Sequence, residues 1–519
     1  MNSVRTGIIA VALLVVGLCL GTGPALAENV ITPDSILERN ENGYGVSRVF
    51  DISMGGHYRL RAVGLADLPI DANGTRSQQE MYGEHRFRVS PWLSLWDSLF
   101  LHAQADFFTG QLFGDTTDVG ADWVRTPRDS HDGYWDFDPR HLYLEWKAPF
   151  GMVKAGQMGS HWGLGILAND GEDRDIRFGD RHHGDIVDRV LIALPPAALF
   201  SDADWAKRLV LALGFDVVFR DENADLLDGD FAMQGVGSLG YHAESWSVGA
   251  YVAYRSQEDD DGSDLWATAV DLFADWTLPL GEDGNKLRLA LEAIITVGHT
   301  NRVEPERAPD GMDLLSFGAL FRVEAELPNL GLFPRLDIGF ASGDEDRTDD
   351  VNRAFSFDPD HRVGLILFDQ VLPRMSARTA DLVYDTSRQA IPPKGSRWMP
   401  TNGSVTNAFY LFPSIDYRPV TGLSLRLGLL YALAPASVSG PYESAINGGY
   451  PTNYLGGENG GSLGVEIDAG VTYTINVFDV VGAAFGVESA VFFPGDALNG
   501  PAVSLDTLWA ARGTFDLLW

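Results

Sequence analysis

The sequence predicts an all-β fold: a transmembrane up-and-down antiparallel β-barrel of about 18 strands, within a range of about 16 to 18. Three observations predict it. Apolar and polar residues alternate with period two in segments of about 9 to 15 residues. The connections between these segments are alternately short and long, and aromatic residues gather at the segment ends. Short periplasmic turns, long outer loops and aromatic girdles are typical of outer-membrane barrels.

Composition restricts the classes of protein to consider. The 519 residues are 45% hydrophobic, so the chain is not disordered. The formal net charge is −34, which excludes nucleic acid as a partner because such proteins need a basic footprint to neutralise phosphates. One barrel accounts for a length that would otherwise suggest several domains.

The N-terminus predicts secretion. Residues 1–27 combine Arg5, an apolar stretch over 7–20 and a small-x-small ending at Ala27, which together predict a signal peptide. The apolar stretch is too short for a spanning helix, which needs about 20 residues. The only cysteine, Cys19, would leave with this signal, so we expect no thiolate metal site. Residues 28–54 are predicted to be an N-terminal periplasmic segment and 55–519 the barrel.

Strand segments follow one another along the rest of the chain. Each has one apolar and one polar face, as a wall between lipid and water requires. The predicted strands are 55–66, 83–95, 98–111, 139–147, 151–163, 188–196, 206–220, 231–244, 246–257, 265–279, 285–300, 313–329, 330–344, 408–420, 422–436, 462–475, 479–497 and 504–519.

The long connections are predicted to lie on the outer side of the membrane. The largest are 112–138, 164–187, 345–407 and 437–461. The connection 345–407 is too long for a plain turn. Apolar residues between Val363 and Val383 have helix-compatible spacings, so we expect a short amphipathic helix that lies across the mouth or inside the bore as a lid.

The apolar face of the strands predicts contact with membrane lipid and lipopolysaccharide. In 422–436, for example, alternate residues from Leu423 to Leu429 are leucine, whereas Arg426 lies on the opposite face. The last strand ends at Trp519. A C-terminal aromatic residue on such a strand is similar to the signal that the bacterial barrel-assembly machinery recognises, so this machinery is a predicted partner.

The opposite face places charges of both signs in the lumen. Arginines recur on the first two strands and on the last, which must close against the first, and they predict an anion-contacting stripe. The alternative is that these charges pair across neighbouring strands and stiffen the wall. The predicted lumen and selectivity residues are Arg59, Arg61, Arg86, Arg88, Arg512, Glu84, Asp106, Glu145 and Lys154.

The loop 164–187 is rich in turn residues and charges. It is predicted to fold inward as a constriction formed by Asp170, Asp180, Arg181 and Asp185. Two alternatives are a solvated loop and a hard-cation site, in which acidic loops would hold a structural calcium ion. Apart from that, no cofactor is expected. His182 and His183 near Asp185 would suit a hydrolase, but neighbouring histidines in an extended loop point in opposite directions, so no catalytic residue is assigned.

The hairpin 143–157, with Gly151, Val153 and Gly156 opening its second strand, resembles the repeated strand-turn-strand of Gram-negative porins. The stretches 159–165, 169–171, 179–180 and 188–189 resemble an uncharacterised outer-membrane β-barrel family of deltaproteobacteria. This resemblance implies a porin-like barrel and transfers no binding residue. More distantly, the chain resembles alginate-export barrels, which implies export of a polyanion along lumenal arginines, although the lumen here is close to neutral.

Together these features predict a channel of the bacterial outer membrane that is not an enzyme. It would pass small polar solutes or sugars through a charged lumen. The alternatives are a polysaccharide exporter of the alginate-export type, an outer-membrane hydrolase, and a structural or adhesive barrel whose lumen is filled.

Overall fold

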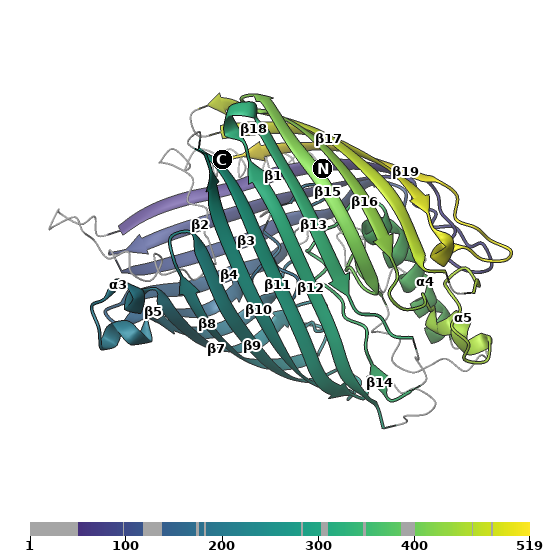
Figure 1. Ribbon diagram of the computed structural model, residues 1–519, viewed down its shortest axis with the longest axis horizontal. Helices are drawn as coiled ribbons and strands as arrows, with labels where there is room; N and C mark the ends of the chain where they lie inside the picture. The colour runs from purple at the N-terminus through teal and green to yellow at the C-terminus, as the bar shows by residue number, and fades with distance from the viewer. Residues whose placement is uncertain are drawn as a thin grey trace, which may run out of the picture.

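A computed structural model describes residues 50–96, 98–117, 137–172, 176–180, 183–281, 284–302, 310–345, 349–385, 400–458, 460–478 and 481–519. The predicted signal peptide lies outside these residues. They form one sheet of 19 strands, and in it every strand except the short β14 pairs with the wall strands before and after it in sequence (Figure 1). The strand β14 (Val351–Asn352) has two residues and lies parallel to β12 (Met312–Glu326) outside the wall order, whereas the other 18 strands are antiparallel and form a closed barrel.

The wall strands match the predicted segments closely. Their bounds are β1 (Phe50–Leu65), β2 (Met81–Leu95), β3 (Leu99–Gly114), β4 (Phe137–Ala148), β5 (Gly151–Gly159), β6 (Ile186–Leu194), β7 (Leu209–Arg220), β8 (Phe231–His242), β9 (Trp246–Glu258), β10 (Asp264–Leu280), β11 (Asn285–Thr300), β12 (Met312–Glu326), β13 (Leu332–Ala341), β15 (Ala408–Val420), β16 (Leu423–Leu433), β17 (Ser462–Phe478), β18 (Val481–Pro494) and β19 (Leu508–Leu518). The predicted fold class is confirmed.

Many strand ends differ from the prediction by a few residues, and two of these differences have a visible cause. The first strand begins at Phe50 rather than at 55, because β2 continues to Leu95 and pairs with these additional residues. The last five residues of the predicted segment 28–54 are therefore strand. The fifth strand ends at Gly159 rather than at 163, because the chain turns away from the wall, with Gly163 in a left-handed conformation.

The barrel closes between its first and last strands. β1 and β19 pair over the register from His57 opposite Leu518 to Leu65 opposite Ala510. Trp519 continues this pairing through both of its backbone hydrogen bonds to Gly56, and its ring lies 5.4 Å from that of Phe87. Closure leaves no unpaired edge, which a sheet in hydrocarbon requires.

Lipid-facing and inward-facing residues alternate along the wall strands as predicted. In β16, Leu427, Leu429 and Tyr431 are exposed on the outside, whereas Leu430 and Ala432 between them are fully buried. The outer surface is therefore apolar, as a lipid-facing wall is. No helix among the described residues is long and apolar enough to cross a membrane.

The outer loops fold into the barrel and build a hydrophobic core there. The core joins residues of the connections 66–80, 160–185 and 349–407 to inward-facing wall residues such as Tyr410. A π-helical turn, η4 (Leu367–Val371), leads into the helix α4 (Leu372–Tyr384), which is nearly all buried and contacts the short helix α5 (Pro441–Ile446) (Figure 1). The helix predicted within 345–407 thus lies inside the bore.

The seam between β1 and β19 gives a test of closure. A Cβ at Gly56 would lie 2.3 Å from the carbonyl oxygen of Arg88 and 2.8 Å from the Trp519 ring. We expect Gly56→Val to reduce the fraction of chain that folds into the heat-resistant, fast-migrating barrel in gel electrophoresis. Gly513→Val is the matched control, because nothing lies within 4 Å of that position. Equal folding of the two variants would contradict the inference that the seam closes only when position 56 lacks a Cβ atom.

Candidate solute path

Four of the predicted arginines come together on the inner face of β1 and β2. The antiparallel register places Arg59 opposite Arg86, and Arg61 opposite Glu84. Period two then directs these side chains to the same side of the wall. Arg59, Arg61, Arg86 and Glu84 line a small cavity with His85, Thr109 and Asp180, and this cavity has room for about one water molecule.

The inward loop supplies the main counter-charge to this stripe. Asp180 forms ion pairs with Arg59 and with Arg61, the second at 2.9 Å, and lies 3.8 Å from Arg86. Arg59 also pairs with Asp516 of β19, and Arg61 with Glu84. The arginines are therefore charge-compensated, and a loop carboxylate stands between them and the rest of the bore.

The third and fourth strands continue the network. Arg88 holds Asp106 with two hydrogen bonds of 2.6 and 2.8 Å and reaches Glu172 of the inward loop at 3.2 Å. Arg140 of β4 is fully buried and donates to the carbonyl oxygens of Asp170 and His183, at 2.7 and 2.6 Å. Asp170 thus contributes backbone, rather than its carboxylate, to this contact.

The remaining predicted lumen residues lie in separate pairs. Arg512 pairs with Glu488, which also lies 3.2 Å from Arg426. Lys154 lies 3.4 Å from Glu145 across the hairpin of β4 and β5. The structure therefore brings Arg59, Arg61, Arg86 and Asp180 together.

Two wall carboxylates, which the sequence analysis did not single out, hold the loops in place. Glu466 of β17 accepts hydrogen bonds from the backbone N–H groups of Leu365, Ile366 and Leu367, the last two at 2.8 Å. Glu292 of β11 does the same for Leu164 and for Ile166.

Both loop-binding carboxylates are fully buried, and each has a second carboxyl group beside it. These neighbours are Asp468 for Glu466 and Asp271 for Glu292. The neighbours of Glu466 in the sheet register are Leu430 and Phe492, so no arginine compensates it from an adjacent strand. An inward carboxylate opposite apolar residues is the signal that could have identified this role once the strand register was known.

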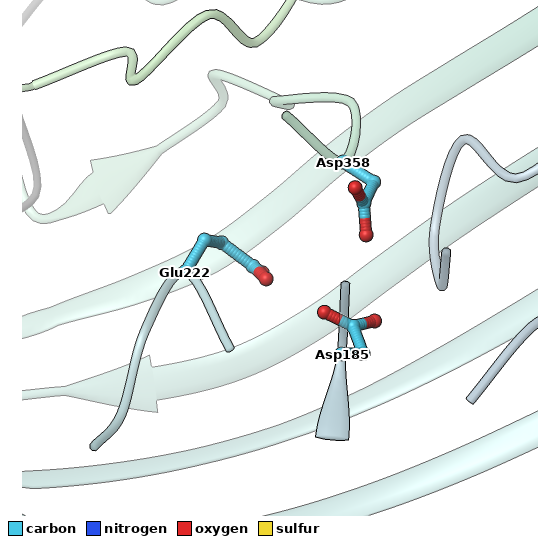
Figure 2. A group of neighbouring side chains, drawn as sticks. All are labelled: Asp185, Glu222 and Asp358. Carbon is cyan, nitrogen blue, oxygen red and sulfur yellow. The ribbon is translucent and has the colours of Figure 1, made fainter. Parts of the chain in front are cut away.

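Asp185 takes part in a different cluster from Asp180. It lies with Glu222 and Asp358 so that one carboxylate oxygen of each is within 4.8 Å of the others (Figure 2). Three such oxygens have the chemistry to bind a hard cation. Burial, followed by the nearby charges of Asp358 and Glu222, raises the pKa of Asp185 well above its usual range. Arg181, predicted with this group, lies outside the described residues.

The histidine suggested for hydrolysis is enclosed. The His183 carbonyl oxygen accepts hydrogen bonds from Arg140 and Arg220. Burial lowers the pKa of its ring to about 4, so the ring is neutral at physiological pH. His182 lies outside the described residues.

Comparison with known proteins identifies the fold. No family model matches the chain, and no curated protein matches it in sequence. Among solved structures, it is similar to a double variant of OccD1 (OprD), with 14% identity, a TM-score of 0.50, and coverage of 91% of this chain and 97% of the other. Pseudomonas aeruginosa OprD gives 13% identity and a TM-score of 0.49, with 91% and 97% covered. Acinetobacter baumannii OccAB1 gives 10% identity and 0.46, with 90% and 96% covered.

At this low identity the likeness to the OccD1 variant concerns the fold alone. The closed barrel and its apolar outer wall are those of a β-barrel of the bacterial outer membrane. The wall contacts membrane lipid. These similarities confirm neither the deltaproteobacterial nor the alginate-export resemblance.

The loop anchor at Glu466 can be tested by removing it. Glu466→Ala leaves three buried N–H groups without their acceptor, at a cost of about 1–3 kcal/mol for each group. We expect faster protease cleavage within 349–385 and a larger single-channel conductance. Asp275→Ala is the control, because Asp275 pairs at 2.6 Å with Arg288 of the neighbouring strand and holds no loop. The same protease resistance in both variants would contradict the anchor.

The raised pKa of Asp185 predicts how loop stability depends on pH. A carboxyl group whose pKa is raised by folding contributes stability at low pH, and this contribution is lost as pH rises through the folded pKa. Protection of the 160–185 loop against hydrogen exchange should therefore fall as pH is raised from about 4 to about 8. Asp185→Asn should flatten this dependence. If protection of the loop depends on pH in the same way in the variant, a group other than Asp185 causes the dependence.

Proposed function

We propose that the protein is a channel for small polar solutes, sugars among them, and that the inward loops and the arginine stripe select what passes. The observation that supports this proposal most directly is the contact of Asp180 with Arg59, Arg61 and Arg86. A loop carboxylate set among wall arginines places opposite charges at the same level of the bore. Such a transverse arrangement favours polar molecules that can exchange hydrogen bonds with both signs of charge.

The size of the solute follows from the filling of the bore. The core built by the loops and α4 occupies its outer part. A polymer would need a wide, continuous path, whereas a small solute can follow the charged face of β1 and β2. The compensation of each of the four arginines by a carboxylate also disfavours the exporter of a polyanion, which would need an excess of positive charge.

The other two alternatives are weaker. A hydrolase would need a histidine accessible to substrate, and His183 has its ring enclosed with a pKa of about 4. A purely structural barrel has no need of this cluster of arginines around a loop carboxylate on the inner face of its wall. The filled outer part of the bore nevertheless makes a closed resting state part of the proposal.

Ion selectivity tests the channel. Asp180→Ala removes one negative charge beside three arginines, worth about 1 kcal/mol, or about fivefold, for each unit charge in water. Because the change favours chloride and disfavours potassium, the chloride-to-potassium permeability ratio should rise about 25-fold. The combined change Arg86→Ala and Arg88→Ala should shift the ratio toward potassium. The reversal potential in a planar bilayer under a salt gradient measures both.

The matched control is Asp188→Ala, which removes the same charge from the exposed outer face of β6. Its reversal potential should equal that of the unsubstituted barrel. Identical potentials in all variants would exclude the stripe from the ion path, and a folded barrel without any conductance would overturn the channel itself.

A further inference from the structure

The connection between β6 and β7, residues 195–208, is longer than the other short connections between wall strands at its end of the barrel. Turns such as 243–245 and 421–422 only reverse the chain. This one contains a 3-10 turn, η2 (Pro196–Leu199), and a short helix, α3 (Asp204–Lys207). Figure 1 shows α3 beyond the strand ends, at the end of the barrel opposite α4 and α5. With long loops outside, this end faces the periplasm.

Large apolar side chains of this connection are exposed. The exposed fractions are 57% for Leu199, 90% for Phe200 and 55% for Trp205, whereas Ala206 beside them is fully buried. A group of this kind is unfavourable in water, and an exposed apolar group on a protein usually marks a surface that something covers.

The position of the connection indicates that lipid covers these apolar side chains. The strands that it joins carry exposed apolar residues on their outer face, among them Ile192 of β6 and Leu213 of β7, so the group continues the lipid-facing wall. β6 has only nine residues, the lower limit of the about 9 to 11 that a tilted strand needs to cross the hydrocarbon. The residues that follow Leu194 therefore lie at the depth of the lipid headgroups.

The chemistry of the connection agrees with this depth. Tryptophan is enriched where membrane meets water, since its ring is apolar and its N–H polar. Asp202 and Asp204 are balanced by Lys207 and Arg208, so the segment offers no net charge to an acidic or basic protein partner. Insertion of apolar side chains is the interaction that remains.

We propose that residues 195–208 form a lipid-inserted foot, in which Leu199, Phe200 and Trp205 enter the periplasmic leaflet of the outer membrane beside β6 and β7. The foot anchors the side of the wall where the strands are shortest, β5 and β6 having nine residues each. This inference does not depend on the solute that the channel carries.

A site-specific fluorescent label tests the foot in the full chain. The only cysteine of the sequence is Cys19, and the unsubstituted protein serves as the labelling blank. Phe200→Cys carries the label at the foot. Thr421→Cys carries it at an exposed position in a short turn at the same end of the barrel. Both are reconstituted in phosphatidylethanolamine and phosphatidylglycerol vesicles with iodide on both sides, or with lipids that bear a nitroxide on the acyl chain.

The expected result is that the label at position 200 is quenched by the nitroxide lipids and protected from iodide, whereas the label at 421 shows the reverse. Iodide quenching at position 200 as strong as at 421 would place the foot in water and overturn the proposal. Protection from both quenchers that disappears on dilution into excess lipid would show that a second copy of the chain covers the group, which also overturns it.

Discussion

Every backbone N–H and C=O group within the hydrocarbon must find its partner inside the protein, and the rest of this structure depends on that constraint. It forces β19 back onto β1 and leaves the sheet with no free edge. Closure in turn divides the residues of each strand between lipid and lumen, because successive side chains point to opposite faces. Most charged residues of the spanning strands then lie inside, so a charged bore follows from the need to hide backbone polarity from lipid.

A bore of this width would be an open water channel if the outer loops stayed outside. The wall prevents this by offering the hydrogen-bond acceptors and donors that the loop backbone needs. Glu466 and Glu292 bind backbone N–H groups of two loops that would otherwise be buried without partners, and Arg140 binds two loop carbonyls in the same way. Once held, the loops bury their apolar residues against each other and against Tyr410. Polar anchoring and apolar packing therefore stabilise the same inward arrangement.

The charges of the lumen also depend on contacts between the wall and the inward loops. Wall arginines cannot be brought together on neighbouring strands without counter-charges, because like charges at this spacing repel strongly where water is restricted. Some of the counter-charges lie on adjacent strands, such as Glu84 and Asp106, but Asp180 and Glu172 come from the loop. The loop that narrows the bore is thus also part of the electrostatic balance of the wall, and solute selection and loop position become coupled.

The sequence by itself determined the barrel, its number of strands and the inward side of Arg59, Arg61, Arg86 and Arg88, because period-two alternation and connection length are local properties. It also indicated a helix within 345–407. Only the tertiary structure decided that Asp180 meets those arginines, that Asp185 lies instead with Glu222 and Asp358, and that Glu466 holds a loop one hundred residues away in sequence. Such contacts depend on how far each loop folds into the bore, and this is set by packing among loops distant in sequence, for which no local pattern exists.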